Sequence, residues 1–232
     1  MIQVQLEEVR SQIKETAYKV NRNPEDITLI AVSKTYPASV IEEAIANGCM
    51  DFGENHVQEL CQKIESINTP VKWHLIGHLQ TNKVKYIIGK TELIHSLDSL
   101  RLAEEIEKQS AKKGIITRVL VEVNVAEEAS KYGFKIEEVI EVMKQLNEMS
   151  HIKVEGLMTV APFVENPEEN RTIFRELYRL SVDIQKQKFD NISTNILSMG
   201  MSNDYKIAIE EGATMVRVGS AIFGNRDYSK HH

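Results

Sequence analysis

Lys34 is the residue best placed by type and position to do chemistry. It ends residues 28–34, an apolar and β-branched run that is typical of a buried parallel strand. A lysine there either keeps its tip in water and its stem on apolar surface, or has a lowered pKa and attacks a carbonyl to form a Schiff base. The solvated arrangement is the commoner one for a single residue, so the rest of the chain must decide.

Two segments near the carboxyl end of the chain carry groups that bind phosphate. Ser198, Gly200 and Ser202 precede an expected helix, and Gly219 and Ser220 precede the last helical stretch. Free backbone N–H groups and the helix dipole favour an anion at such positions. Ordinary capping turns, in which a serine or asparagine only caps the helix, are the alternative. These segments alone leave both open.

An imine-forming lysine and a phosphate site together suggest either pyridoxal phosphate or a Schiff-base aldolase acting on a phosphorylated sugar. Arg217 bears on this choice, because a guanidinium is always charged and only donates hydrogen bonds. Beside a pyridine nitrogen it would keep that nitrogen unprotonated, which weakens the cofactor as an electron sink. An ion pair between Arg217 and Glu210 or Glu211 is the alternative.

Other apparent motifs carry less weight. His74 and His78 are four residues apart, but on an expected strand that spacing covers about 13 Å, too far to share a metal ion. Residues 77–83 lack the spacing of a P-loop. Lys131 is expected in a loop as a solvated charge, although a second amine near the site could compete for an aldehyde. We predict no metal site.

Strands and helices alternate along the whole chain and would bring the candidate residues together. The expected strands are 28–34, 50–53, 71–76, 93–97, 115–125, 154–160, 196–199 and 215–218. Alternation implies a parallel sheet, and eight units in a chain of 232 residues fit a (β/α)8 barrel with an extra N-terminal helix. An open doubly wound sheet is the alternative, but no G-x-G-x-x-G follows the first strand. We expect one domain over residues 1–232.

The active sites of such barrels lie at the carboxyl ends of the strands. Lys34 ends the first expected strand, Asn55 follows the second and His78 follows the third. Met158 lies near the end of the sixth strand and Arg217 near the end of the eighth. Candidate side chains at several strand ends at once are harder to dismiss than any one of them.

Composition limits the partners and the compartment. The chain is 42% hydrophobic and 27% charged with a formal charge of −6, which argues against nucleic acid or an anionic membrane as the main partner. Cys49 and Cys61 form no disulfide framework and match no zinc spacing, so two reduced thiols are expected. The first residues do not resemble a signal peptide, and no segment is long enough to span a bilayer. We expect a cytoplasmic protein.

Six segments of the chain, in order, resemble the pyridoxal phosphate homeostasis protein family. They are residues 31–35 (AVSKT), 52–59 (FGENHVQE), 73–83 (WHLIGHLQTNK), 156–159 (GLMT), 197–204 (LSMGMSND) and 216–220 (VRVGS). The match extends over nearly the whole chain, and the motifs are highly specific in combination. One minor departure is at the C-terminus, where Lys230 is the only lysine and some members carry several.

The resemblance implies a barrel similar to the N-terminal domain of bacterial alanine racemase, without that enzyme's second domain. It implies that Lys34 holds pyridoxal phosphate (PLP) as an internal aldimine and that Arg217 faces the pyridine nitrogen. The phosphate would be bound by Ser202, Gly219 and Ser220, with Gly200 shaping the loop. Asn55, His78 and Met158 would line the ring, and Ser198 would be a further cofactor-binding residue.

Members of the family are regarded as carrier or regulatory proteins for vitamin B6, without an established turnover. We therefore expect a PLP-binding monomer without robust catalysis, whose further partners would be PLP-dependent apoenzymes. A weak amino-acid racemase is the alternative, and an aldolase without PLP is the third reading. Racemisation needs a second acid or base, which in racemases is a tyrosine of the missing domain; Tyr36, Tyr132 and Tyr205 are possible substitutes in this chain.

Overall fold

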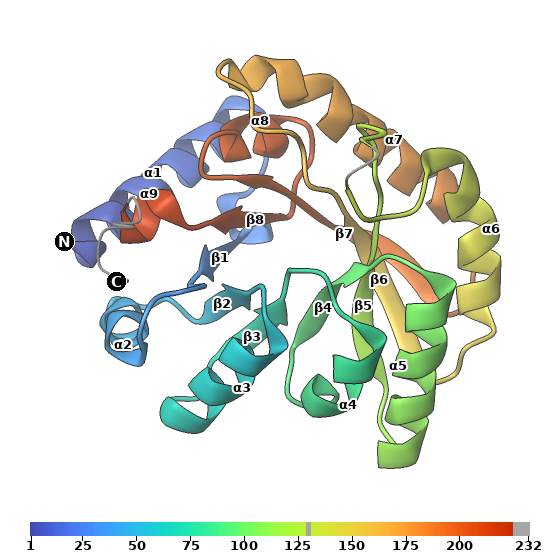
Figure 1. Ribbon diagram of the computed structural model, residues 1–232. Helices are drawn as coiled ribbons and strands as arrows, with labels where there is room; N and C mark the ends of the chain where they lie inside the picture. The colour runs from blue at the N-terminus through green and yellow to red at the C-terminus, as the bar shows by residue number, and fades with distance from the viewer. Residues whose placement is uncertain (129–130, 225–232) are drawn as a thin grey trace.

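The computed structural model describes residues 1–128 and 131–224. In these residues eight parallel strands form a closed barrel in chain order, and the last strand pairs with the first (Figure 1). The predicted (β/α)8 barrel with an extra N-terminal helix is confirmed, and the open doubly wound sheet is wrong. Lys230 lies outside the described residues.

The strands are β1 (Thr28–Val32), β2 (Asp51–Glu54), β3 (Lys72–Leu75), β4 (Leu93–Leu97), β5 (Thr117–Glu122), β6 (Ile152–Met158), β7 (Ile192–Met201) and β8 (Met215–Val218). The α-helices are α1 (Ile2–Lys19), α2 (Ala38–Ala46), α3 (Val57–Ser66), α4 (Val84–Ile87), α5 (Leu100–Lys113), α6 (Ile136–Asn147), α7 (Arg171–Lys186), α8 (Tyr205–Glu210) and α9 (Ser220–Phe223). Short 3-10 helices cover Pro24–Asp26, Thr81–Lys83 and Pro167–Asn170.

The N-terminal helix α1 covers the side of the barrel where the following helices are short. α8 has six residues and α9 has four, and α1 packs beside both of them (Figure 1). Leu6, Val9 and Ile13 recur at helical spacing and are buried in this contact face. The Tyr205 hydroxyl donates to Gln12 Oε1 of α1, so α1 is joined to the end of the chain that carries β8.

Four strands differ from their expected lengths, and one of them is β3, which was expected over 71–76 and covers only Lys72–Leu75. β1 ends two residues early, at Val32, which leaves Lys34 in a turn after the strand. In place of the expected strand 115–125, β5 begins at Thr117 and ends at Glu122, although Val123 and Val125 stay buried. The expected strand 196–199 is longer, since polar residues at the start of β7 concealed it in the sequence.

Two groups of apolar side chains fill the molecule. The large group lies between the strands and the surrounding helices, and a separate small cluster contains Leu93, Leu120 and Met158. Within the described part of the chain, no helix is long and apolar enough to cross a bilayer.

Candidate functional site

A cavity of about 610 Å³ opens at the carboxyl ends of the strands. Six of the residues predicted to bind the cofactor line it: Lys34, Asn55, Ser202, Arg217, Gly219 and Ser220. They follow or end β1, β2, β7 and β8, so the closed barrel brings together segments from both ends of the sequence. This volume is within the range that small-molecule sites occupy.

The turn that carries Lys34 has a strained backbone. The Tyr36 N–H donates to the Ser33 carbonyl, and Thr35 between them has a φ of 71°, a region that is costly for a β-branched residue. The Thr35 N–H donates to Glu59 Oε1 of α3 at 2.5 Å. Lys34 is half-buried at this turn, and the helix behind it therefore holds the turn in place.

A buried ion network lies under the same turn. Lys63 Nζ donates to the Ser33 carbonyl at 2.7 Å, to Glu54 Oε1 at 2.6 Å and to Glu59 Oε1 at 2.7 Å. The Ser33 hydroxyl also donates to Glu54 Oε1 at 2.6 Å. Burial raises the pKa of Glu54, and the hydrogen bonds from Lys63 and Ser33 oppose that rise. The network ties the end of β1 to β2 and α3.

Ser202 joins the two predicted phosphate segments. Its hydroxyl oxygen accepts from the Gly219 N–H at 3.1 Å and from the Ala221 N–H at 3.4 Å, so amides after β8 point towards the loop after β7. The residue before α8 is Asp204, and neither Ser202 nor Asn203 caps that helix. Capping of α8 by Ser202 or Asn203 is therefore wrong, whereas the amides that Ser202 accepts lie at the start of α9, and phosphate binding by Ser202 stays a prediction.

Gly200 shapes the loop that carries Ser202. It has a φ of 89°, and an added Cβ would lie 2.5 Å from Ala208 Cβ and 2.8 Å from Tyr205 Cα. Only glycine fits this close approach between the strand end and α8. Asp204 fixes the same loop, since its carboxylate accepts from the Met201 N–H at 2.7 Å. Gly200 itself does not line the cavity.

Arg217 lies at the inner surface of the cavity and is 3% exposed. Its Nη1 donates to Ser198 Oγ at 2.6 Å and its Nη2 to the Thr159 carbonyl at 2.8 Å. Burial lowers its pKa to about 10, against the charges of Glu122 and Asp204, so the guanidinium stays charged at neutral pH.

The alternative ion pair of Arg217 with residues at the end of α8 is wrong. Glu210 instead binds Lys19 and Arg171, and Glu211 binds Arg171 and Arg175. This surface network joins α1, α7 and α8.

Glu122 at the end of β5 is a buried acid that sequence analysis missed. Burial, together with the charge of Asp98, raises its pKa to about 7, and Arg217 opposes the rise. Asp98 Oδ2 lies 2.7 Å from His78 Nδ1.

Besides Gly200, three predicted residues lie apart from the main cavity. His78 lines a neighbouring cavity of about 330 Å³, which shares Asn55 with the main one, and its ring stacks on Tyr132 at 3.8 Å. Met158 is fully buried in the small apolar cluster, and Ser198 is fully buried against Arg217. Direct contacts of these residues with a cofactor stay predictions.

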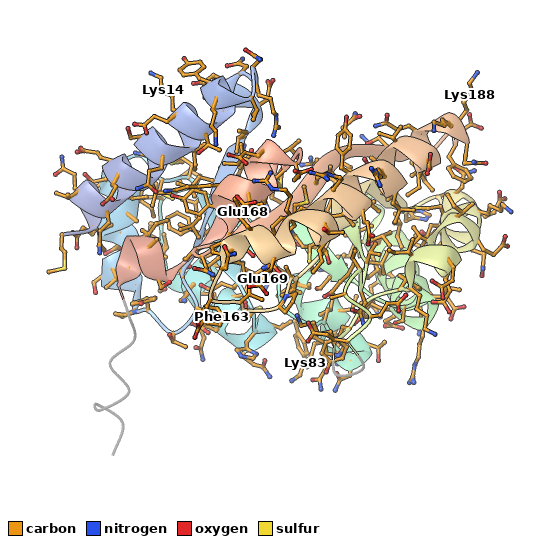
Figure 2. The ribbon with its side chains drawn as sticks, turned by 90° about the horizontal axis from the view of Figure 1, so that it is seen from above. Lys14, Lys83, Phe163, Glu168, Glu169 and Lys188 are labelled. Atoms are coloured by element: carbon orange, nitrogen blue, oxygen red, sulfur yellow. The ribbon has the colours of Figure 1, made fainter. Side chains whose placement is uncertain are left out.

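The cavity also contains aromatic residues without a predicted role in binding. Tyr36 packs its ring on Phe223 at 4.9 Å and donates its hydroxyl proton to the Gly224 carbonyl at 3.0 Å. Phe163 lines the cavity while 84% exposed, on the segment that leads to Glu168 and Glu169 (Figure 2). An exposed phenylalanine in a loop gives no sequence signal for such a position.

The remaining candidates take structural positions. His74 is buried in β3, beside Asp51 and His95. Lys131 contacts Glu128 and donates to the Val160 carbonyl at 3.3 Å, outside the lining of the cavity. No group of three metal-ligating side chains occurs within residues 1–128 and 131–224.

A family model and curated relatives match this chain over nearly its whole length. The family model of the alanine racemase N-terminal domain matches residues 4–227. The pyridoxal phosphate homeostasis protein of Aquifex aeolicus is 44% identical over 224 residues, covering 96% of this chain and 97% of the relative. The protein of that name from Escherichia coli K12 is 40% identical and covers 97% of each chain.

Solved structures give the same result. PipY of Synechococcus elongatus PCC7942, solved with PLP bound, superposes with a TM-score of 0.85 at 32% identity, covering 97% of this chain and 100% of PipY. Alanine racemase of Clostridium difficile 630 superposes with a TM-score of 0.77 at 16% identity, covering 100% of this chain and 58% of the racemase, and shares the fold. The chain therefore belongs to the pyridoxal phosphate homeostasis protein family, within the wider family of the alanine racemase N-terminal domain.

Proposed function

We propose that this protein binds PLP in the Lys34 cavity and takes part in vitamin B6 homeostasis without robust catalysis. The observation that carries the proposal is that one cavity joins an amine, Lys34, to a charged donor, Arg217, and to the two loops linked by Ser202. A relative at 32% identity has been solved with PLP, which supports the same ligand here.

Several of the lining groups have a chemical counterpart in PLP. When bound, PLP supplies an aldehyde, with which an amine condenses to a Schiff base and releases one water. Lys34 is the amine in the cavity, and the strained turn and Lys63 network hold it near one position. The Ser202 hydroxyl, the Ser220 hydroxyl and the amides after β8 suit a phosphate, and Arg217 suits an unprotonated ring nitrogen because it can only donate.

The positions of the three tyrosines support a binding role over racemisation. Tyr205 donates to Gln12 at the α1 contact, and burial raises its pKa to about 12. Tyr132 stacks on His78 outside the main cavity. Tyr36 lines the cavity, but its hydroxyl donates a hydrogen bond to the Gly224 carbonyl. Two of these hydroxyls therefore lie outside the cavity and the third is engaged with the backbone, which supports the binding role. We further propose that residues 1–232 form a single domain and that the protein is a cytoplasmic monomer. The recipients of its PLP would be PLP-dependent apoenzymes.

Transfer of the cofactor tests the carrier role. Protein loaded with PLP is mixed with an apoenzyme, and reactivation is compared with an equal concentration of free PLP. We expect the loaded protein to reactivate the apoenzyme; failure to do so would contradict delivery. In parallel, amino acids incubated with the loaded protein in deuterium oxide should keep their α-proton. Exchange at enzymatic rates would establish the racemase alternative in its place.

A further inference from the structure

A chain of hydrogen bonds runs through the barrel from Asp51 to Arg217. Asp51 Oδ1 lies 3.0 Å from His74 Nε2, and His74 Nδ1 lies 3.0 Å from His95 Nε2. His95 Nδ1 lies 2.8 Å from Ser198 Oγ, which accepts from Arg217 Nη1 at 2.6 Å. The five residues belong to β2, β3, β4, β7 and β8, so the chain crosses the barrel from the start of β2 to the cavity.

A polar barrel interior of this kind costs folding free energy, so it calls for a role that explains it. The interior of this fold is ordinarily filled by bulky branched apolar side chains, and buried polar groups destabilise a protein unless they are hydrogen-bonded. His74, His95, Ser198 and Arg217 are each 3% exposed or less. An apolar filling would avoid this cost, and the apolar cluster around Leu120 shows that the same barrel can accommodate one.

The chemistry of the two ends is satisfied when all the hydrogen bonds run in one direction. Arg217 only donates, so Ser198 Oγ accepts from it, and the Ser198 hydroxyl can in turn donate its proton to His95 Nδ1. His95 must then carry its proton on Nε2 and donate to His74 Nδ1. His74 in turn carries its proton on Nε2 and donates to the Asp51 carboxylate, which only accepts. Each contact then holds one proton, and every nitrogen of the two rings has a partner.

Independent electrostatics agree with a single proton on His95. Its pKa lies well below the ordinary histidine value, because of burial first; the charge that His74 would carry if it were protonated, and the charge of Arg217, act in the same direction. The opposite proton order would place His95 Nδ1–H against Ser198, whose oxygen already accepts from Arg217. The Ser198 proton would then lack its His95 acceptor.

We propose that Ser198, His95, His74 and Asp51 are positioning residues for Arg217, acting as one hydrogen-bonded chain with a fixed proton order. Among the described residues, the direct partners of Arg217 are neutral: a hydroxyl and the Thr159 carbonyl. A carboxylate in direct contact would cancel the charge that Arg217 presents to the cavity. The chain instead orients the guanidinium through neutral groups and ends on a carboxylate at the far side of the barrel.

This inference deepens the proposed function, since it rests on Arg217 facing a bound ligand, but its first test needs no ligand. Nitrogen-15 NMR of the histidine rings in the unmodified protein without PLP reports which nitrogen carries the proton. We expect both His74 and His95 to be protonated on Nε2 alone at neutral pH. A proton on His95 Nδ1, or on both nitrogens of His74, would overturn the proton order.

Ser198→Ala tests whether the chain positions Arg217. The matched control is Ser96→Ala, because Ser96 is equally buried on β4 next to His95, and its hydroxyl makes no hydrogen bond to any residue of 1–128 or 131–224. Ser198→Ala should broaden the Arg217 side-chain resonances and weaken PLP binding about tenfold, with the ligand still attached at Lys34. Ser96→Ala should do neither.

Equal behaviour of the two variants would overturn the positioning role. Failure of the unmodified protein to bind PLP would instead contradict the proposed function. The NMR measurement of the histidine rings would still decide the proton order along the hydrogen-bonded residues. Loss of folding in Ser198→Ala likewise leaves that measurement on the unmodified protein to decide.

Discussion

Glu122→Gln should make the protein more stable at mildly alkaline pH and leave it unchanged in acid. Glu122 is 8% exposed, and its pKa is raised from 4.5 to about 7 by burial and by Asp98. A carboxyl with a raised folded pKa favours folding while it is protonated. That contribution is complete below about pH 4.5 and is lost as the pH rises through about 7.

The size of the effect follows from the shift. A difference of about 2.5 pKa units corresponds to about 3 kcal/mol, so the free energy of unfolding of the wild type should fall by that amount relative to Glu122→Gln between about pH 4 and about pH 8. Urea unfolding of both proteins across this range measures the difference. Glu148→Gln, at an exposed position, is the control and should show no such trend.

A stability difference that does not vary with pH would refute the reasoning. Carbon-13 NMR of the Glu122 carboxyl gives a second check, with a midpoint expected near 7. A midpoint near 4.5 would mean that burial and Asp98 do not govern this group.

The other predictions concern the cavity supports and the thiols. Lys63→Met should lower the free energy of unfolding by about 3–5 kcal/mol, because it leaves Glu54 buried without its cation; in urea, a loss below about 1 kcal/mol would contradict this. Gly200→Ala should lose about 2 kcal/mol from its positive φ and close contacts, and unchanged thermal unfolding would be inconsistent with that. Cys61 should react with a thiol reagent before Cys49, since burial raises the pKa of Cys49 to about 11; peptide mapping showing the reverse order would count against it.

Local sequence patterns were enough to predict the barrel and the residues at the strand ends that line the cavity. The apolar run before Lys34 and the repeated strand–helix alternation depend on neighbouring residues, which sequence shows directly. Arg217 and Gly219 follow from the rule that barrel sites lie at strand ends. The length of β7 was underestimated because its first residues are polar and a strand was expected to be apolar.

The supports beneath the site were beyond sequence analysis because their partners are distant in the chain. Ser198 and His95 are 103 residues apart and meet only when the barrel closes. Thr35 gave no turn signal, since a β-branched residue at positive φ is unfavourable by itself. It is stable there because Glu59 and Lys63 hold the turn, and no local pattern shows that either residue contacts this turn.

Attachment of PLP at Lys34 is the most direct test of the central claim. PLP is added to the protein, the product is reduced with borohydride, and mass spectrometry locates the pyridoxyl group. Lys131→Ala is the matched control, because Lys131 reaches the Val160 carbonyl at the rim without lining the cavity. The account predicts a label on Lys34 in the wild type and in Lys131→Ala, and its loss, together with the visible imine absorbance, in Lys34→Ala. A label on another residue, or imine absorbance that survives in Lys34→Ala, would contradict it.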